Sequence, residues 1–454
     1  MPIFYPRRPQ ALSSLRSAAR TLLVACTACA LTASSSSQTL ARPGWAGSGM
    51  SAEPWWKHAV IYQADPRGFS TSEGSDLHGL TQRLDHIQSL GADAILLTPI
   101  QPDATHAQTI DPAFGTLDDL DDLIHQASRR SIRVLLELDP HIPTTDLNTV
   151  ARFWLNRGIA GFHLAAASPI QTAELRKATG SYVGQRTLIG DIGQATLSPT
   201  PAKGAQSHDD PQLLVDPEPG TAKQLVASAI RPALEAAQDI LQSNRGMPLL
   251  LTDGPAYQRS ISRYADGTHD IAIAKTLAAM LFTTRAAALL YYGQEIGLPT
   301  PADPATATVI PWDAPPAPPA GTPPPNSDTL PPNVALEDAN QQSLLSWYRQ
   351  LSALHHGNRT ISSGANITLN HDDQNILVWV RKPQAVSGIS PAIVIICNLS
   401  AQPVHLSLKE DMKRLNLKGS FLRTIMRSDN ALGPMHLDGM TIAPFTAYIG
   451  ELRY

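Results

Sequence analysis

From Trp55 to about residue 370, short apolar runs that are typical of β-strands alternate with stretches in which apolar residues recur at helical spacing. The stretch that begins at Thr116 shows the helical pattern, with a capping threonine followed by acidic residues in the first turn. Strands that alternate with helices in this order predict an α/β fold, a (β/α)8 TIM barrel over residues 54–369. The eight predicted strands are Ala59–Gln63, Ala94–Leu97, Arg133–Leu138, Gly161–Leu164, Thr187–Gly190, Gln212–Val215, Pro248–Thr252 and Ala288–Tyr291.

After about Asn370 the pattern changes to short strand-like runs that follow one another without helices between them. The runs read ILVWVRK, AIVIICNLS, VHLSLK and YIGELRY, and polar turns separate them. Alternating strands of this kind predict a small antiparallel β-sandwich over residues 370–454, packed against the barrel.

Residues 299–332 are rich in proline and lack apolar periodicity. This composition predicts an extended, solvated loop between the last barrel strand and the last helix, Asn340–Leu354. A docking role for the proline motifs is the alternative reading.

The first 41 residues follow the order of a secretory signal peptide: four arginines, an apolar run from Thr21 to Ala33, and a small-residue site that ends at Ala41. The apolar run is too short to remain as a membrane-spanning helix. We therefore expect a signal peptide at residues 1–41, a linker at 42–53, and export to the periplasm or the extracellular space. Anchoring as a lipoprotein at Cys26 is a minor alternative, because Leu-Val-Ala-Cys resembles a lipoprotein box.

Charge and cysteine content exclude several kinds of partner. A net charge of −4 with interspersed signs offers no basic surface for nucleic acid. Once Cys26 and Cys29 leave with the signal peptide, Cys397 remains alone, so neither an internal disulfide nor a thiolate zinc site can form. Cys397 lies in an apolar run and is expected to be a buried packing residue. No cofactor is expected.

Several motifs resemble those of one enzyme family. The segment from Arg152 to Ser168, RFWLNRGIAGFHLAAAS, is similar to FWLDRGVDGFRIDAV of the α-amylase superfamily (glycoside hydrolase family 13). WWKHAVIYQADPRGF resembles the family's opening motif, YYGQEIGLP its eighth-strand motif, and IPWDAP the α-glucosidase and trehalose synthase branch. The resemblance covers nearly the whole chain from Trp55 onward. It implies a catalytic barrel followed by a C-terminal β-domain.

The resemblance also shows where the catalytic motifs are degenerate. The family's retaining reaction needs a nucleophilic aspartate, a glutamic acid that protonates the leaving oxygen, and a second aspartate that grips the substrate. Ala165 stands at the nucleophile position and has no atom that can attack, while His163 stands at the neighbouring arginine position. Asp191 stands at the acid position and is one methylene shorter than the family's glutamate.

Other positions that contact sugar in the family depart as well. The third carboxylate falls at Gly254 or Ala256, and Asp253 could replace it only if the turn is rearranged. Ile142 occupies the position of the family's histidine. The loop that carries the family's stacking tyrosine is shortened, so this tyrosine is deleted. The loop that carries calcium ligands is shortened as well, which leaves too few carboxylates for a calcium cage. The pocket is altered while the frame is kept.

Three functions are compatible with this pattern. The first is a catalytically inactive pseudo-glycosidase that acts as an exported carbohydrate-binding or scaffold module, with an α-glucan or oligosaccharide as ligand and an unknown protein partner. The second is an enzyme with altered acid–base or metal-assisted chemistry, because side chains at the carboxyl ends of neighbouring strands converge. The third is a residual retaining α-glycosidase. The residual pocket candidates are Asp65, Arg67, Glu137, Asp139, His141, His163, Asp191 and Asp253, and under the first hypothesis none of them is a catalytic residue or a metal ligand.

Overall fold

The computed structural model describes residues 53–70, 74–191, 210–243, 245–303, 306–314, 332–369, 373–383 and 391–454. The expected signal peptide, the lipoprotein cysteine Cys26 and nearly all of the expected linker lie outside these residues, and so does most of the Pro-rich stretch. The barrel and the C-terminal strands belong to one compact unit that runs from Ala52 to Tyr454.

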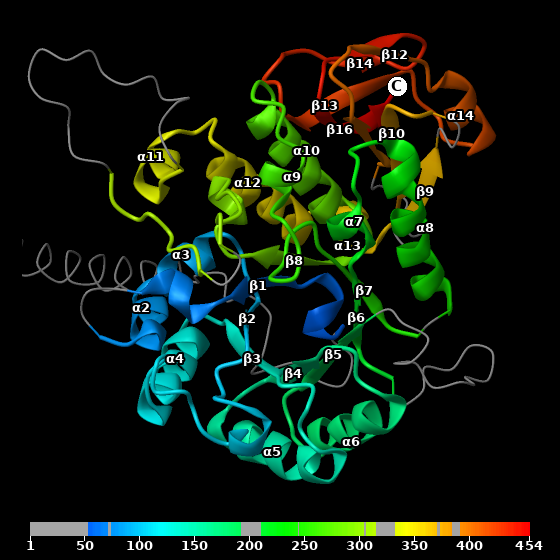
Figure 1. The fold of residues 1–454 in the computed structure, drawn as a ribbon. Coiled ribbons are helices and arrows are strands. Elements are labelled where there is room, and N and C mark those ends of the chain that lie inside the picture. Colours follow the sequence, from blue (N-terminus) through cyan, green and yellow to red (C-terminus); the bar gives the residue numbers. More distant parts are fainter. Residues whose placement is uncertain are drawn as a thin grey trace, which may run out of the picture. The chain divides into compact units, whose positions relative to one another are not determined.

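Eight parallel strands form a closed barrel in which each strand pairs with the next and the eighth pairs with the first (Figure 1). The strands are β1 (Val60–Ala64), β2 (Ala94–Leu97), β3 (Arg133–Leu138), β4 (Gly161–Leu164), β5 (Thr187–Asp191), β6 (Leu213–Asp216), β7 (Met247–Leu250) and β8 (Ala287–Tyr291). The predicted barrel is confirmed, and each predicted strand end lies within two residues of the observed one.

The barrel interior is filled by alternate residues of the strands, as the period of two requires. Ile61, Leu135 and Leu213 belong to one buried apolar cluster inside the barrel, and the Trp55 side chain packs against this cluster. Gly161 on β4 is a point of close approach, because a Cβ placed there would lie 2.0 Å from the carbonyl oxygen of Thr187 on β5. Only glycine fits at this position without moving one of the two strands.

Helices follow most strands on the outside of the barrel, and local sequence signals define their ends. The helix expected after Thr116 begins at Leu117, and Thr116 and Asp119 form a reciprocal capping box at its start. Gly158 ends the helix before β4 in a left-handed conformation with φ of 108°. The helices between β1 and β8 are α2 (Asp76–Gln82), α3 (Leu84–Ser89), α4 (Leu117–Arg129), α5 (Thr144–Arg157), α6 (Pro169–Gly180), α7 (Glu218–Thr221), α8 (Ala227–Ser243), α9 (Ser260–Arg263) and α10 (Asp270–Thr283).

Three further helices connect the barrel to the C-terminal strands: α11 (Val334–Ala339), α12 (Leu344–Gly357) and α13 (Arg359–Ser363). Helix α12 corresponds to the helix predicted at Asn340–Leu354, and it packs against α10. Among the described helices, none combines the length and the apolar composition needed to cross a lipid bilayer.

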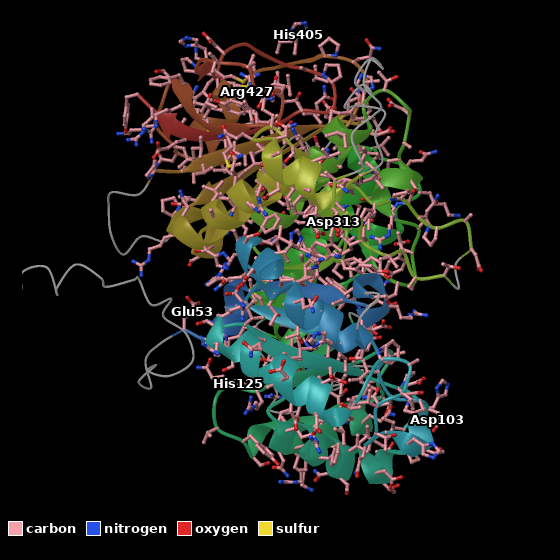
Figure 2. The ribbon with its side chains drawn as sticks, turned by 90° about the vertical axis from the view of Figure 1, so that its left-hand side faces the viewer. Glu53, Asp103, His125, Asp313, His405 and Arg427 are labelled. Atoms are coloured by element: carbon pink, nitrogen blue, oxygen red, sulfur yellow. The ribbon has the colours of Figure 1, made fainter. Side chains whose placement is uncertain are left out.

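The C-terminal strands form a six-stranded antiparallel sheet in the order β14-β13-β16-β11-β10-β9 and a two-stranded sheet of β12 and β15. Their bounds are β9 (Ala365–Leu369), β10 (Ile376–Lys382), β11 (Ile393–Asn398), β12 (Val404–Leu406), β13 (Phe421–Arg427), β14 (Met435–His436), β15 (Met440–Ile442) and β16 (Ala447–Arg453), with a short helix α14 (Lys409–Arg414) after β12. The large sheet begins at Ala365, before residue 370. Figure 2 labels His405 and Arg427 in this part of the chain, and Asp103 and His125 in the barrel part.

Both faces of the six-stranded sheet are buried. Alternate residues such as Leu377, Trp379 and Cys397 join the large apolar cluster that includes the barrel helices, while Val378 and Ile396 join a second cluster under β12, β15 and α14. The expectation that Cys397 is a buried packing residue is confirmed. The antiparallel domain is therefore a two-layer sandwich that shares one layer of its core with the barrel.

A buried cation fixes the sheet to the end of α10. The Arg381 guanidinium is inaccessible to solvent and donates hydrogen bonds to the carbonyl oxygens of Thr283 and Gly364 at 2.7 and 2.9 Å. The Trp379 indole nitrogen donates to the same Thr283 carbonyl at 3.3 Å. Burial lowers the pKa of Arg381 to about 9. These bonds satisfy a helix carbonyl that has no partner within its own helix.

Candidate functional site

Four polar side chains form a chain of contacts at the carboxyl ends of the barrel strands. Gln63 on β1 donates from Nε2 to Oε2 of Glu137 on β3 at 3.3 Å. The same Oε2 lies 3.6 Å from Nδ1 of His163 on β4, an ion pair that is longer than a hydrogen bond. His163 Nε2 lies 3.4 Å from Oδ1 of Asp191 on β5. The imidazole thus lies between two carboxylates from the neighbouring strands.

The electrostatics of this cluster keep the imidazole charged. Burial alone would lower the pKa of His163, but the hydrogen bond with Asp191 and the negative charge of Glu137 raise it to about 10. Burial alone would raise the pKa of the Asp191 carboxyl, but His163 and the amide of Ala166 hold this pKa below its ordinary value. The cluster is an imidazolium flanked by two carboxylates near neutral pH.

Ala165 lies beside this cluster on the turn that follows β4. Its side chain is a partly exposed methyl group, so position 165 brings no nucleophile to the barrel mouth. The next residue, Ala166, has a left-handed φ of 51° and donates its amide hydrogen to Oδ2 of Asp191 at 2.7 Å. Both oxygens of Asp191 therefore have partners, and the carboxyl group at the acid position serves to hold the β4 turn.

The region of the third carboxylate has a different occupant. A Cβ placed on Gly254 would lie 3.2 Å from the ring of Tyr257, so this ring takes the space into which a side chain at position 254 would extend. Burial and the negative charge of Asp191 raise the pKa of Tyr257. A tyrosine ring thus lies beside Gly254, one of the two positions at which the resemblance places the third carboxylate.

Asp253 is buried and holds a loop rather than facing the mouth. Its carboxylate accepts hydrogen bonds from the backbone amide and the hydroxyl of Ser260, the latter at 2.7 Å, and from the Thr252 hydroxyl at 2.8 Å. Ser260 begins α9, so the carboxylate satisfies a free amide at a helix start. Asp253 does not replace the third carboxylate of the family.

We expect Asp253→Ala to lower the free energy of unfolding by about 2–3 kcal/mol, because two hydroxyls and one amide lose a buried acceptor. Asp253→Asn keeps one acceptor oxygen and is expected to lose about 1 kcal/mol. Urea unfolding followed by circular dichroism measures both. Asp239→Ala on the exposed face of α8 is the control. An unchanged free energy of unfolding in Asp253→Ala would contradict a structural role for Asp253.

Two further pairs of candidates lie apart from the cluster around His163. Asp139 accepts hydrogen bonds from the backbone amide and Nδ1 of His141, both at 2.8 Å, and the His141 side chain is 84% exposed. Asp65 is buried and forms a close ion pair with the half-exposed Arg67 at 2.7 Å. His141 therefore does not join His163. Within the described residues no group of three or more His, Cys, Asp or Glu side chains is arranged to hold a metal ion.

The sequence did not single out several residues of the mouth. Gln63 has the same strand parity as the inward residue Ile61, and this parity could have identified it. Arg259 is buried between Tyr291 and Tyr292, with its guanidinium carbon 4.6 and 4.9 Å from the two ring centres, and it donates to the Tyr292 carbonyl at 2.7 Å. No short-range pattern links Arg259 to these rings.

The chain is similar to several proteins of known family. Residues 60–142 match the family model of the alpha amylase catalytic domain. The amino acid transporter heavy chain SLC3A2 of Oryctolagus cuniculus is 28% identical over 362 residues, which is 71% of this chain and 65% of that protein. The trehalose-6-phosphate hydrolase of Escherichia coli is 44% identical over 95 residues, 18% of this chain and 17% of the enzyme. The matched part is less than two thirds of each relative's own length.

The solved structure of trehalose-6-phosphate hydrolase from Bacillus licheniformis has the same fold, with a TM-score of 0.73 and 17% sequence identity over 88% of this chain and all of that one. The family-model match spans strands β1 to β3 of the barrel. The chain is similar to proteins of the α-amylase superfamily (glycoside hydrolase family 13), among them its trehalose-6-phosphate hydrolase members, and it shares their fold.

Proposed function

We propose that this chain is a catalytically inactive member of the superfamily and acts as an exported binding or scaffold module. The observation that carries the proposal is the alanine at position 165 next to a carboxylate, Asp191, whose two oxygens already hold His163 and the Ala166 amide. Retaining hydrolysis needs two free carboxyl groups about 5–5.5 Å apart, one to attack and one to protonate. Export rests on the arginines and the apolar run within residues 1–41.

The extent of the similarities supports the scaffold role over turnover. The alignment with the transporter heavy chain runs over 362 residues, whereas the alignment with the E. coli hydrolase covers 95. The first of these proteins is named as the heavy chain of a transporter and not as an enzyme. By this similarity, the partner we propose is a protein, and a membrane transport protein is the first class to test.

Binding of an α-glucan or oligosaccharide at the barrel mouth is the second candidate function. The partly exposed ring of Tyr257 beside Gly254 favours it, because a tyrosine ring offers a face to a sugar. Calorimetric titration with maltoheptaose separates the candidates. Binding that Tyr257→Ala abolishes supports the sugar site, and no heat supports the scaffold role alone.

The expected result of the activity test is no release of glucose from maltose, maltooligosaccharides or p-nitrophenyl α-glucoside by the purified chain. Ala165→Asp is also expected to be inactive, because it restores one carboxylate while Asp191 stays engaged and Gly254 offers no third group. Enzymes that lose one such group lose several orders of magnitude in rate. Discontinuous glucose assays with an active α-glucosidase as positive control give the measurement.

Turnover above background that disappears in Asp191→Asn would overturn the proposal and identify the chain as a residual glycosidase. Turnover that survives this substitution would instead mark a contaminating enzyme, so the variant serves as an internal control.

A further inference from the structure

A groove of about 640 Å³ lies in the C-terminal domain, and all of its lining residues come from the chain after residue 408. Helix α14, the turn from Asn416 to Ser420 and the end of β16 surround it. This volume is within the range of small-ligand sites. Because the barrel contributes no lining residue, the groove is separate from the mouth described above.

The rim of the groove is basic. Lys409, Lys413 and Lys418 line it together with two carboxylates, Glu410 and Asp438. Glu410 lies 3.8 Å from Lys413, and both side chains are more than four-fifths exposed, so this pair is weak and easily separated. Lys409 and Lys418 form no ion pair with other described residues. With Lys413 paired to Glu410, Lys409 and Lys418 outnumber Asp438, and this excess of one positive charge in a chain of net charge −4 favours an anion at the groove.

The floor and the open end of the groove have a different chemistry. Met412 and Leu437 are buried beneath it and give an apolar base. The Tyr454 side chain is 82% exposed at the edge and presents a ring to solvent. Asn416 and Asp438 add exposed amide and carboxylate oxygens that accept hydrogen bonds from hydroxyl groups.

We propose that this groove binds an acidic oligosaccharide, a short chain of sugar rings that bear carboxylates. The lysines would pair with the carboxylates, the Tyr454 ring would stack on an apolar sugar face, and Asp438 would accept a hydroxyl hydrogen. A poly-acidic peptide fits less well, because its side chains bring no hydroxyl donors for Asp438. The proposal does not depend on whether the barrel mouth is catalytically inactive.

The test is calorimetric titration of the full chain with trigalacturonate and, in parallel, with the neutral trisaccharide maltotriose at 50 mM salt. We expect binding of trigalacturonate, a loss of at least tenfold in affinity in Lys409→Gln/Lys418→Gln, and a further loss on raising the salt to 200 mM. Lys177→Gln/Lys223→Gln, two exposed lysines outside the groove, is the matched control and should bind as the wild type does. Tyr454→Ala should weaken trigalacturonate binding as well.

Three results would overturn the proposal. The first is equal affinity for maltotriose, which would remove the role of the lysines. The second is an equal loss in the control variant, which would mean a diffuse charge effect. The third is tighter binding of hexaglutamate than of trigalacturonate, which would assign the groove to an acidic peptide. Thermal unfolding of each variant confirms that the exposed substitutions leave the fold intact.

Discussion

Replacement of His163 by glutamine is expected to lower the free energy of unfolding by about 2–3 kcal/mol at neutral pH, because two partly buried carboxylates lose their shared cation. The pH dependence follows from the raised pKa. A histidine titrates near 6.5 in the unfolded chain and at about 10 here, so the stabilisation is fully present below pH 6.5 and is lost as the pH rises through about 10. The lowered pKa of Asp191 acts at the acidic end of the pH range. Its contribution to the free energy of unfolding is lost as the pH falls through that pKa.

Urea unfolding at intervals from pH 6 to pH 10 measures this effect. The wild type should lose stability steadily across that range, and His163→Gln should show a shallower dependence. His141→Gln is the matched control, because its imidazole is 84% exposed and pairs with the neighbouring Asp139. Parallel pH profiles for the wild type and His163→Gln would show that the imidazolium between the strands contributes nothing.

Gly161→Ala is expected to lower the free energy of unfolding by about 3 kcal/mol or more, which is the upper end of the effects of overpacking a core. The added methyl group would lie 2.0 Å from the carbonyl oxygen of Thr187, and a backbone atom in a barrel strand cannot move aside as a flexible side chain can. Strands β4 and β5 would have to separate at the point where Gly161 pairs with Thr187. A lower midpoint of thermal and urea unfolding, or loss of soluble protein, is the readout.

Gly180→Ala provides the comparison within the same part of the chain. Nothing lies within 4 Å of a Cβ at Gly180, the last residue of α6, and alanine is the better helix former. We expect the free energy of unfolding to stay the same or to rise by up to about 1 kcal/mol. Similar stabilities for Gly161→Ala and Gly180→Ala would show that the contact between β4 and β5 can relax.

The barrel was predictable because each of its strands is an apolar run that breaks off at polar or small residues. The inward and outward positions follow from the alternation of side chains along each strand. Glycine is required at position 161 of β4 because the Thr187 carbonyl lies too close for a side chain. The same alternation directs Glu137, His163 and Asp191 into the barrel, and their places at or near the ends of their strands bring them to its carboxyl end. The strands and the direction of their side chains depend on local sequence and on regular strand pairing, and both can be read from one sequence.

The parts that could not be predicted depend on contacts between distant residues. Asp139 and His141 follow β3 closely, but an Asp-Pro-His turn bonds to itself and directs the imidazole to solvent. The Tyr257 ring reaches the space beside Gly254 because the loop after β7 folds back, and nothing in its residues fixes that direction. Asp253 similarly meets Ser260 only in the folded loop. Side chains on such loops must be located by structure.

The core that the six-stranded sheet shares with the barrel has an evolutionary consequence. Trp379, Cys397 and Arg381 contact the barrel helices far from the carboxyl ends of the strands, so changes at positions 165 and 254 leave that core untouched. Carboxylates at a reaction site commonly reduce stability, and their loss carries no folding penalty of its own. Substitutions at the barrel mouth can therefore change the chemistry of this architecture while the folded core is inherited unchanged.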